Sequence, residues 1–205
     1  MPGKASLSRL RPRSYPGLPC VRSPHRCAAL SSVPNGRAIP EQDARSSLTR
    51  RLALAVATGA GAGYSPVASG TAGAAVGAVL FWPLAALPVP LYAVTVIGIT
   101  CLGIWAADLA DRTWGTKDDG RIVVDEIAGQ LISLFPLLLL GRARSPGWIV
   151  TGFVAFRVFD VWKPGPARWL EENLEGGAGV VLDDVAAGVL AALALAVLIL
   201  ASRAS

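Results

Sequence analysis

Apolar residues dominate the chain from Leu52 onward, in long stretches that short polar or proline-containing segments interrupt. No Asp, Glu, Lys or Arg occurs between Leu52 and Ala107. A helix that crosses a membrane needs about 20 consecutive apolar residues, and Pro88 and Pro90 divide this run into two segments. The pattern predicts five apolar helices, over residues 71–87, 91–110, 122–140, 147–162 and 184–202.

Five such helices indicate an all-α, multi-helix bundle that is embedded in a membrane. Hydrophobic residues make up 53% of the chain and charged residues only 16%, whereas soluble domains contain about 45–50% apolar and about 25% charged residues. The mean hydropathy is +0.50. A soluble bundle of very apolar helices is the alternative, because the third and fourth helices carry the charged residues Asp125, Glu126, Arg157 and Asp160.

The N-terminal segment has a different composition. Residues 1–51 contain ten Lys or Arg and two acidic residues, whereas the remainder of the chain is net acidic. The segment is rich in Pro and Ser and has no apolar periodicity, so it cannot bury enough surface to fold. We therefore predict a disordered basic tail over residues 1–50, followed by a helical domain over residues 51–205. No nucleic-acid partner is expected, because interleaved aromatic residues and nucleic-acid-binding motifs are absent.

The basic tail also predicts the orientation of the helices. Cytoplasmic segments beside membrane helices are enriched in Lys and Arg, so the tail is expected in the cytoplasm. Arg142 and Arg144 fall on the opposite side and oppose this assignment, but the tail carries more charge. With alternating crossings, three segments meet at the cytoplasmic face and predict a single site there: residues 59–73, 108–126 and 157–184.

The chain lacks the residues that several common mechanisms require. His25 is the only histidine, and the three cysteines have no zinc-ligand spacing, which excludes histidine relays, zinc modules and a disulfide framework. Cys20 and Arg26 match the C-x5-R spacing of cysteine-dependent phosphatases, but no apolar strand precedes them and no helical pattern follows. The chemistry must therefore use carboxylates, Lys or Arg, hydroxyls and backbone groups.

A glycine-rich motif, A-T-G-A-G-A-G-Y-S-P-V-A-S-G-T-A-G, covers residues 57–73. Its glycines would let backbone amides approach an anion, and Ser65, Ser69 and Thr71 would add hydroxyl donors. A helix that begins near Thr71 would favour phosphate at its N-terminus. The alternative is a small-residue surface for helix packing, which is common in membranes. The motif alone does not decide between the two.

Two pairs of adjacent acids, Asp125–Glu126 and Asp183–Asp184, each precede an apolar helix. Acids in a first turn can simply complement the helix dipole. Next to long uncharged helices, paired carboxylates instead suit a hard cation such as Mg²⁺, which also binds phosphate oxygens.

Basic residues follow the fourth helix and complete the candidate chemistry. Arg157 and Asp160 share a helical face and can neutralise each other, whereas Lys163 and Arg168 lie beyond them in sequence. A Lys and two Arg beside carboxylates would balance the charge of a phosphoryl group. These segments suggest metal-assisted chemistry on a lipid phosphate. A membrane transporter or permease that uses intramembrane Asp and Arg residues is the alternative.

Four segments together resemble the phosphatidylglycerophosphatase A family: G-Y-S-P-V-A-S-G-T-A-G, I-V-V-D-E-I-A-G, G-F-V-A-F-R-V-F-D-V-W-K-P-G-P-A-R-W and G-G-A-G-V-V-L-D-D-V-A-A-G. They occur in the family's order over about residues 52–190. The chain departs from the family's usual pattern at Ser69, Gln130 and Gly165. The resemblance implies Mg²⁺-dependent hydrolysis of phosphatidylglycerophosphate to phosphatidylglycerol and phosphate. It also implies a bacterial inner-membrane protein with a helical core.

On this resemblance we assign roles to individual residues. Asp125, Glu126, Asp183 and Asp184 are the expected catalytic and metal-binding residues, one of them acting as a base. Ser65, Thr71, Arg157 and Lys163 are expected to bind the phosphate, and Asp118 and Asp160 are secondary candidates. The active site is expected to face the cytoplasm. The transporter alternative would require acids near mid-membrane and internal repeats, and a CDP-alcohol transferase would require a D-G-x-x-A-R motif; the sequence contains neither pattern.

Overall fold

The computed structural model describes residues 40–116 and 119–204. The chain separates into two units after Pro40, and the second unit, residues 41–205, contains all the elements below apart from the first residue of α1. Every regular element in the described part of the chain is a helix. In order they are α1 (Pro40–Ala57), the 3-10 helix η1 (Gly59–Tyr64), α2 (Ser69–Leu84), α3 (Val89–Trp114), α4 (Val124–Leu139), α5 (Pro146–Trp162), α6 (Gly165–Asn173) and α7 (Gly176–Ala204).

Helices α2, α3, α4, α5 and α7 overlap the five ranges that the apolar pattern predicted. Helix α7 begins at Gly176, eight residues before the predicted start, so Asp183 and Asp184 lie within it and do not precede it. Among the described helices, α3 and α7 are long and apolar enough to cross a membrane, with 26 and 29 residues. The other three contain 16 or 17 residues. The all-helical fold class is therefore confirmed, whereas the crossing of the membrane by five helices stays a prediction.

Helix α1 corrects the predicted extent of the disordered tail. The composition of the sequence predicts a tail that reaches residue 50, but α1 begins at Pro40, so residues 40–50 are helical. Pro40 occupies the first helical position, where its fixed φ and missing N–H are favourable, and no further proline occurs before Pro66. The remainder of the predicted tail, residues 1–39, lies outside the described residues.

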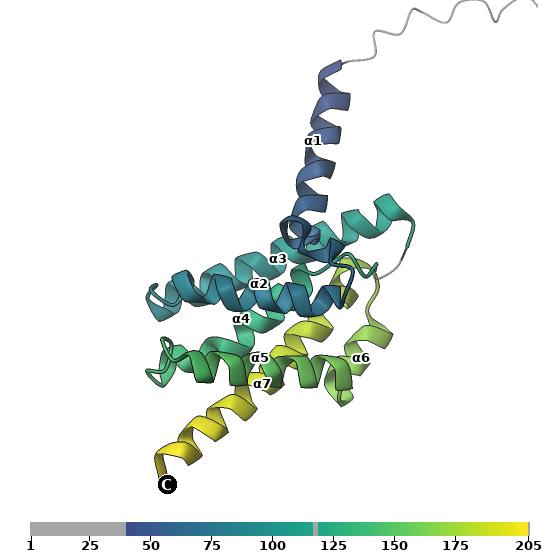
Figure 1. The fold of residues 1–205 in the computed structure, drawn as a ribbon. Coiled ribbons are helices and arrows are strands. Elements are labelled where there is room, and N and C mark those ends of the chain that lie inside the picture. Colours follow the sequence, from purple (N-terminus) through teal and green to yellow (C-terminus); the bar gives the residue numbers. More distant parts are fainter. Residues whose placement is uncertain (1–39, 117–118, 205) are drawn as a thin grey trace, which may run out of the picture. The chain divides into compact units, whose positions relative to one another are not determined.

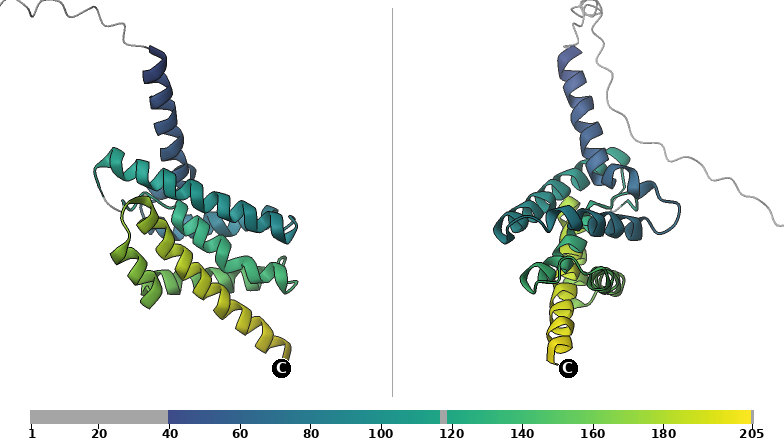
Figure 2. Two further views of the ribbon diagram at one scale, coloured as in Figure 1. Left: turned by 180° about the vertical axis from the view of Figure 1, so that it is seen from behind. Right: turned by 60° about the vertical axis from the view of Figure 1, so that its left-hand side comes forward.

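Helix α4 occupies the centre of the bundle. It contacts α2, α3, α5 and α7, and Figures 1 and 2 show it between the α2–α3 pair and the α5–α7 pair. Leu131, Leu134 and Leu137 on α4 are fully buried. Tyr92 on α3 is buried beside them, and its hydroxyl donates to the carbonyl oxygen of Leu131 at 2.8 Å. Because α4 has neighbours on all sides, its first turn is the natural place for side chains from several helices to meet.

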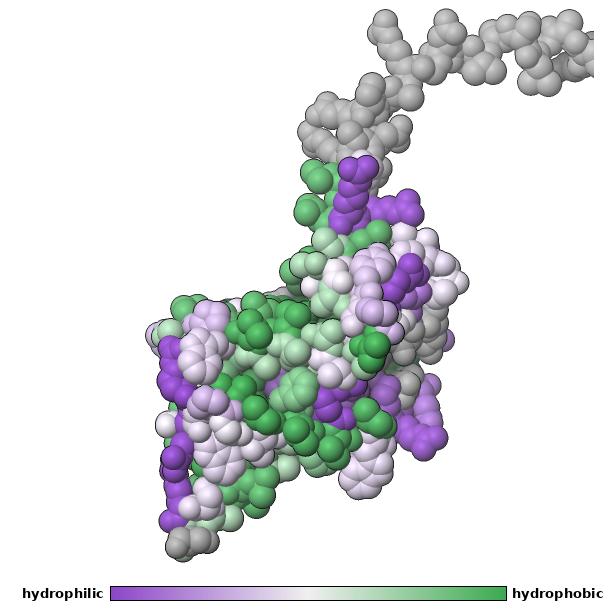
Figure 3. Space-filling model, viewed as in Figure 1, coloured by the Kyte–Doolittle hydropathy of each residue, from purple (hydrophilic) through white to green (hydrophobic). Residues whose placement is uncertain are grey.

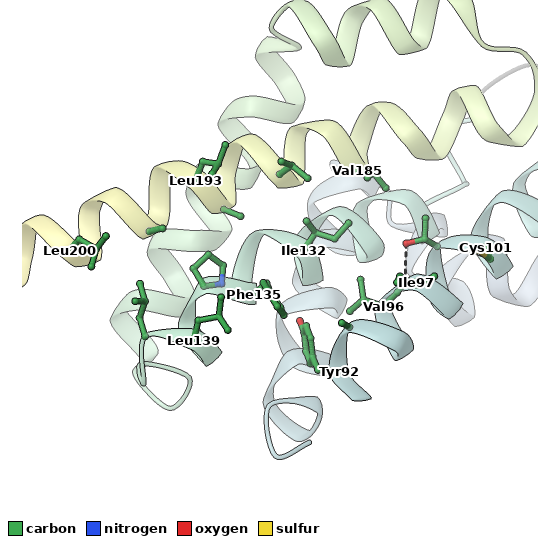
Figure 4. A pocket seen from close by; sticks show the side chains of 17 residues that line it. Tyr92, Val96, Ile97, Cys101, Ile132, Phe135, Leu139, Val185, Leu193 and Leu200 are labelled. Atoms are coloured by element: carbon green, nitrogen blue, oxygen red, sulfur yellow. Dashed lines mark hydrogen bonds between the residues drawn. The ribbon is translucent and has the colours of Figure 1, made fainter. Parts of the chain in front are cut away.

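The outer surface of the bundle is also apolar. Hydrophobic side chains cover much of the face shown in Figure 3, with a hydrophilic patch among them. On the α3–α4–α7 side, a groove of about 630 Å³ is lined almost entirely by apolar side chains, among them Val96, Ile132, Phe135, Val189 and Leu193 (Figure 4). Soluble monomers rarely expose apolar areas of this extent, so the surface suits contact with lipid.

Candidate active site

Helices α4 and α7 cross where each has a glycine one turn after a carboxylate. Gly129 follows Asp125 by four residues, and Gly188 follows Asp184 by four. A Cβ on residue 188 would lie 2.5 Å from the carbonyl oxygen of Gly129, and a Cβ on residue 129 would lie 2.7 Å from the carbonyl oxygen of Asp184. Residues four apart share a helical face. The close crossing at the glycines therefore brings the carboxylates of the two helices together.

Asp125, Glu126 and Asp184 form a carboxylate cluster at this crossing. One carboxylate oxygen of each residue lies within 4.8 Å of the other two. Asp125 and Asp184 are only 6% and 5% exposed, and Glu126 Oε2 is buried without a hydrogen-bond partner among the described residues. Burial of several negative charges is costly unless a cation balances them. An all-oxygen donor set suits a hard divalent cation such as Mg²⁺.

Arg157 on α5 supplies a positive charge at the edge of the carboxylate cluster. Its Nη1 donates to Asp160 Oδ2 on the next turn. Gly70, in the first turn of α2, packs directly against these groups, because a Cβ on residue 70 would overlap Glu126 Oε1 and would lie 3.2 Å from both terminal nitrogens of Arg157. Only a glycine lets α2 come this close to a carboxylate and a guanidinium at once.

Lys163, the residue after α5, supplies a second positive charge. Its Nζ donates to Asp183 Oδ2 at 2.8 Å, and the Asp183 side chain is only 6% exposed. The Lys163 backbone has a left-handed φ of 44°, which ends α5 and is uncommon for a residue with a Cβ. The carboxylate cluster does not include Asp183. The structure therefore brings three of the four predicted acids together and places the fourth against a predicted phosphate-binding residue.

The predicted hydroxyl donors have separate surroundings. Ser65 donates from Oγ to the carbonyl oxygen of Val67 at 2.9 Å, and Thr71 is exposed beside Gly70. Asp118 lies outside the described residues. The role of these residues in binding phosphate stays a prediction.

The glycine-rich motif serves helix packing at Gly73, and Gly77, one turn further along α2, acts in the same way. A Cβ on Gly73 would lie 2.9 Å from the carbonyl oxygen of Val123, and a Cβ on Gly77 would lie 3.0 Å from that of Ile127. These glycines let α2 pack closely on α4. The packing interpretation of the motif is confirmed at Gly73, and this packing helps to place Gly70 against the carboxylate cluster.

Contacts in the loop between α3 and α4 were not anticipated from the sequence. Asp119 accepts hydrogen bonds from Arg121 Nε at 2.6 Å and from Nη2 at 2.7 Å, and these side-chain hydrogen bonds lower the pKa of Asp119 to about 2. The Arg121 guanidinium lies 3.9 Å from the centre of the Trp114 ring. The contacts fix the chain just before Asp125. In the sequence, the Asp-x-Arg spacing just before α4 is the pattern that could have indicated these contacts.

The fold and the site define a helical protein in which a carboxylate cluster lies beside an arginine, with a lysine paired to the acid next to Asp184. This combination is suited to phosphate chemistry. A family model described as Phosphatidylglycerophosphatase A matches residues 55–199. The chain therefore belongs to the phosphatidylglycerophosphatase A family and is a phosphatase. The match confirms the resemblance that the four sequence motifs indicated.

Curated relatives agree with this assignment. The chain is 39% identical over 138 residues to phosphatidylglycerophosphatase A of Escherichia coli, covering 67% of this chain and 77% of the relative. The protein of the same name from Haemophilus influenzae is 35% identical over 137 residues, with 66% and 82% coverage. A Bacteroides thetaiotaomicron relative, whose name proposes a phosphatidylinositol-3-phosphatase, is 39% identical over 152 residues, with 71% and 92% coverage. No solved structure matches the chain.

Proposed function

We propose that this chain is a Mg²⁺-dependent phosphatase of the bacterial inner membrane that hydrolyses phosphatidylglycerophosphate to phosphatidylglycerol and phosphate. The observation that carries the proposal is the convergence of Asp125, Glu126 and Asp184 within 4.8 Å, next to the guanidinium of Arg157. The names of the E. coli and H. influenzae relatives support the choice of substrate.

Asp125, Glu126 and Asp184 are the residues that would hold Mg²⁺. When bound, the ion supplies charge balance for the phosphate and acidifies a water molecule. Glu126 is our candidate for the group that accepts the proton of the attacking water, because its Oε2 is buried without a hydrogen-bond partner among the described residues. A carboxylate in this position would act as a general base.

Arg157 and Lys163 would bind the phosphate oxygens. Each is held by a carboxylate of its own, Arg157 by Asp160 and Lys163 by Asp183, which orients the cation and reduces its freedom to move. Charge-assisted hydrogen bonds of this kind are among the stronger polar contacts in proteins. In this proposal Asp160 and Asp183 act through the cations that they position. Thr71 and Ser65 complete the predicted phosphate contacts.

The proposed membrane placement has the site end of the bundle facing the cytoplasm. At the opposite end, the Arg144 guanidinium lies 5.4 Å from the centre of the Trp82 ring, and Trp162 is 70% exposed at the site end. Trp and Arg are typical of the two membrane–water interfaces. Helices of 16 or 17 residues span about 25 Å at 1.5 Å per residue, so local thinning of the bilayer would accommodate α2, α4 and α5.

Phosphate release by the purified full-length chain tests the proposal. Phosphatidylglycerophosphate and phosphatidylinositol 3-phosphate are each supplied with Mg²⁺ or with EDTA, and the parent chain is compared with Asp125→Asn, Asp184→Asn and the control Glu172→Gln, an exposed carboxylate paired with Arg168. We expect Mg²⁺-dependent release from phosphatidylglycerophosphate that both Asn variants abolish and Glu172→Gln retains. Preference for the inositol lipid would correct the substrate, and EDTA-resistant activity would refute the role of the metal.

A further inference from the structure

A stripe of exposed valines runs along α5 beside the candidate active site. Val154, Val158 and Val161 are 53%, 54% and 74% exposed, and their spacing of four and three residues places them on one face of the helix. All three side chains are apolar, so their exposure to water is unfavourable.

Arg157 lies at the edge of this stripe. It is three residues after Val154 and four before Val161, so the same face of α5 carries apolar positions one turn to either side of a guanidinium. The Arg157 side chain is 21% exposed, while a Cβ on Gly70 would contact both its terminal nitrogens and Glu126. Arg157 therefore connects the buried carboxylate cluster with the outer surface between α2 and α5.

We infer that the lipid substrate reaches the carboxylate cluster sideways, between the first turn of α2 and α5, with an acyl chain lying on Val154, Val158 and Val161. The inference rests on the proposed function. It assigns the valines of α5 to substrate binding and Arg157 to the entrance, where it meets the phosphate of the arriving headgroup. Trp162, exposed directly after the stripe, sets the α5 terminus at the headgroup level.

The apolar groove between α3, α4 and α7 is the competing position for an acyl chain. It offers a volume of about 630 Å³. However, neither the three clustered carboxylates nor Arg157 is among the residues that line the groove. The valine stripe, in contrast, adjoins Arg157 directly.

Kinetics on two substrates test the inference. The double variant Val154→Asn/Val158→Asn is compared with Val94→Asn/Val197→Asn, whose valines on α3 and α7 are similarly exposed at 64% and 65%. The substrates are dioleoyl phosphatidylglycerophosphate in mixed micelles and its water-soluble deacylated headgroup. We expect the α5 pair to raise KM for the lipid by roughly fivefold to tenfold, from the loss of apolar contact, with kcat/KM for the deacylated headgroup unchanged. An equal effect of the control pair, or an unchanged KM for the lipid, would overturn the inference.

Photolabelling of the parent chain gives a second measurement that does not depend on how the variants fold. A substrate analogue with a diazirine in mid-chain is photolysed, and the labelled peptides are identified by mass spectrometry with and without excess unmodified substrate. Competable labelling within residues 147–162 supports entry along α5. Competable labelling of α3 and α7, or labelling that substrate does not displace, refutes it. A parent chain that releases phosphate from neither the lipid nor the deacylated headgroup would instead refute the proposed function.

Discussion

Gly188 on α7 lies directly against Gly129 on α4, and a Cβ on residue 188 would be 2.5 Å from the Gly129 carbonyl oxygen. Backbone meets backbone at this point, so neither helix can move aside by a change of rotamer. Asp184 and Asp125 lie one turn before the two glycines on the same helical faces. Because neither glycine has a side chain, α4 and α7 approach closely, and this approach sets the distance between the carboxylates of Asp125 and Asp184.

Gly188→Ala should separate α4 from α7 and pull the carboxylate cluster apart. Overpacking of a closely packed contact costs about 1–3 kcal/mol, so we expect a lower Tm together with a large loss of phosphatase activity. Gly98→Ala is the matched control, because a Cβ there would meet nothing within 4 Å; it should be neutral or stabilising by up to about 1 kcal/mol through helix propensity. Thermal unfolding in detergent measures both. Equal changes in Tm for Gly188→Ala and Gly98→Ala would contradict the close crossing of α4 and α7.

Gly70→Ala should act on activity more than on stability. The added methyl group would overlap Glu126 Oε1, which is the end of a flexible side chain and can move, and would press on Arg157. We expect a loss of activity with a Tm close to that of the parent chain. Gly147→Ala, at an open position in the first turn of α5, should leave both unchanged. A Gly70→Ala variant with full activity would show that the positions of Glu126 and Arg157 are not critical.

The contact between Lys163 and Asp183 predicts a coupled pair of substitutions. Lys163→Met removes the cation at 2.8 Å from a carboxylate that is 6% exposed. Breaking a fully buried ion pair on one side costs about 3–5 kcal/mol, and we expect a smaller loss here because the Lys163 side chain is 29% exposed. Lys163→Met/Asp183→Asn removes both charges and should recover part of that stability without recovering activity. A double-mutant cycle of unfolding free energies measures the coupling. Strict additivity of the two substitutions would argue against a direct interaction.

Adjacent acids show how far the sequence could predict the site. The pairs Asp125–Glu126 and Asp183–Asp184 were recognisable as adjacent acids beside apolar runs, but only the first pair lies in the first turn of its helix, because α7 begins at Gly176 and contains Asp183 and Asp184. The different contacts of the two acids in a pair could not be predicted, because neighbouring residues point about 100° apart on a helix. Asp184, on the same face as Gly188, turns toward α4, whereas Asp183 turns toward Lys163. The helix–helix contacts that decide this, such as Gly70 against Arg157, join residues far apart in sequence.

The helices themselves were easier to predict, because long apolar runs require burial whatever their neighbours. Two were missed. Residues 40–50 of α1 were grouped with the Pro- and Arg-rich segment before them on composition. Helix α6, with nine residues, is short and half polar, and its Pro-Gly-Pro start concealed it. Averaged composition therefore does not predict short helices, because single residues, such as a proline at the first helical position, determine where such helices begin.

Asp119 predicts a pH dependence of stability. Hydrogen bonds from Arg121 hold the pKa of Asp119 at about 2 in the folded chain, below the value of about 3.9 for an unperturbed Asp. A lowered pKa stabilises the folded state above the unfolded pKa, and this contribution is lost as the pH falls toward the folded pKa. Asp119→Asn should therefore lower Tm at pH 5 to 8, and the difference from the parent chain should shrink below about pH 4. A difference that persists undiminished at pH 3 would contradict the assignment.

Metal binding can be examined apart from catalysis. A ligand that binds only the folded state raises stability according to its concentration relative to Kd, by about 2.7 kcal/mol at 100 times Kd. Mg²⁺ should therefore raise the Tm of the parent chain, and EDTA should reverse the change. Asp184→Asn removes one of the three clustered carboxylates and should abolish most of the increase, whereas Glu172→Gln, far along the exposed helix α6, should retain it. An increase of the same size in Asp184→Asn would mean that Mg²⁺ stabilises the chain from a site elsewhere, and would contradict metal binding by the carboxylate cluster.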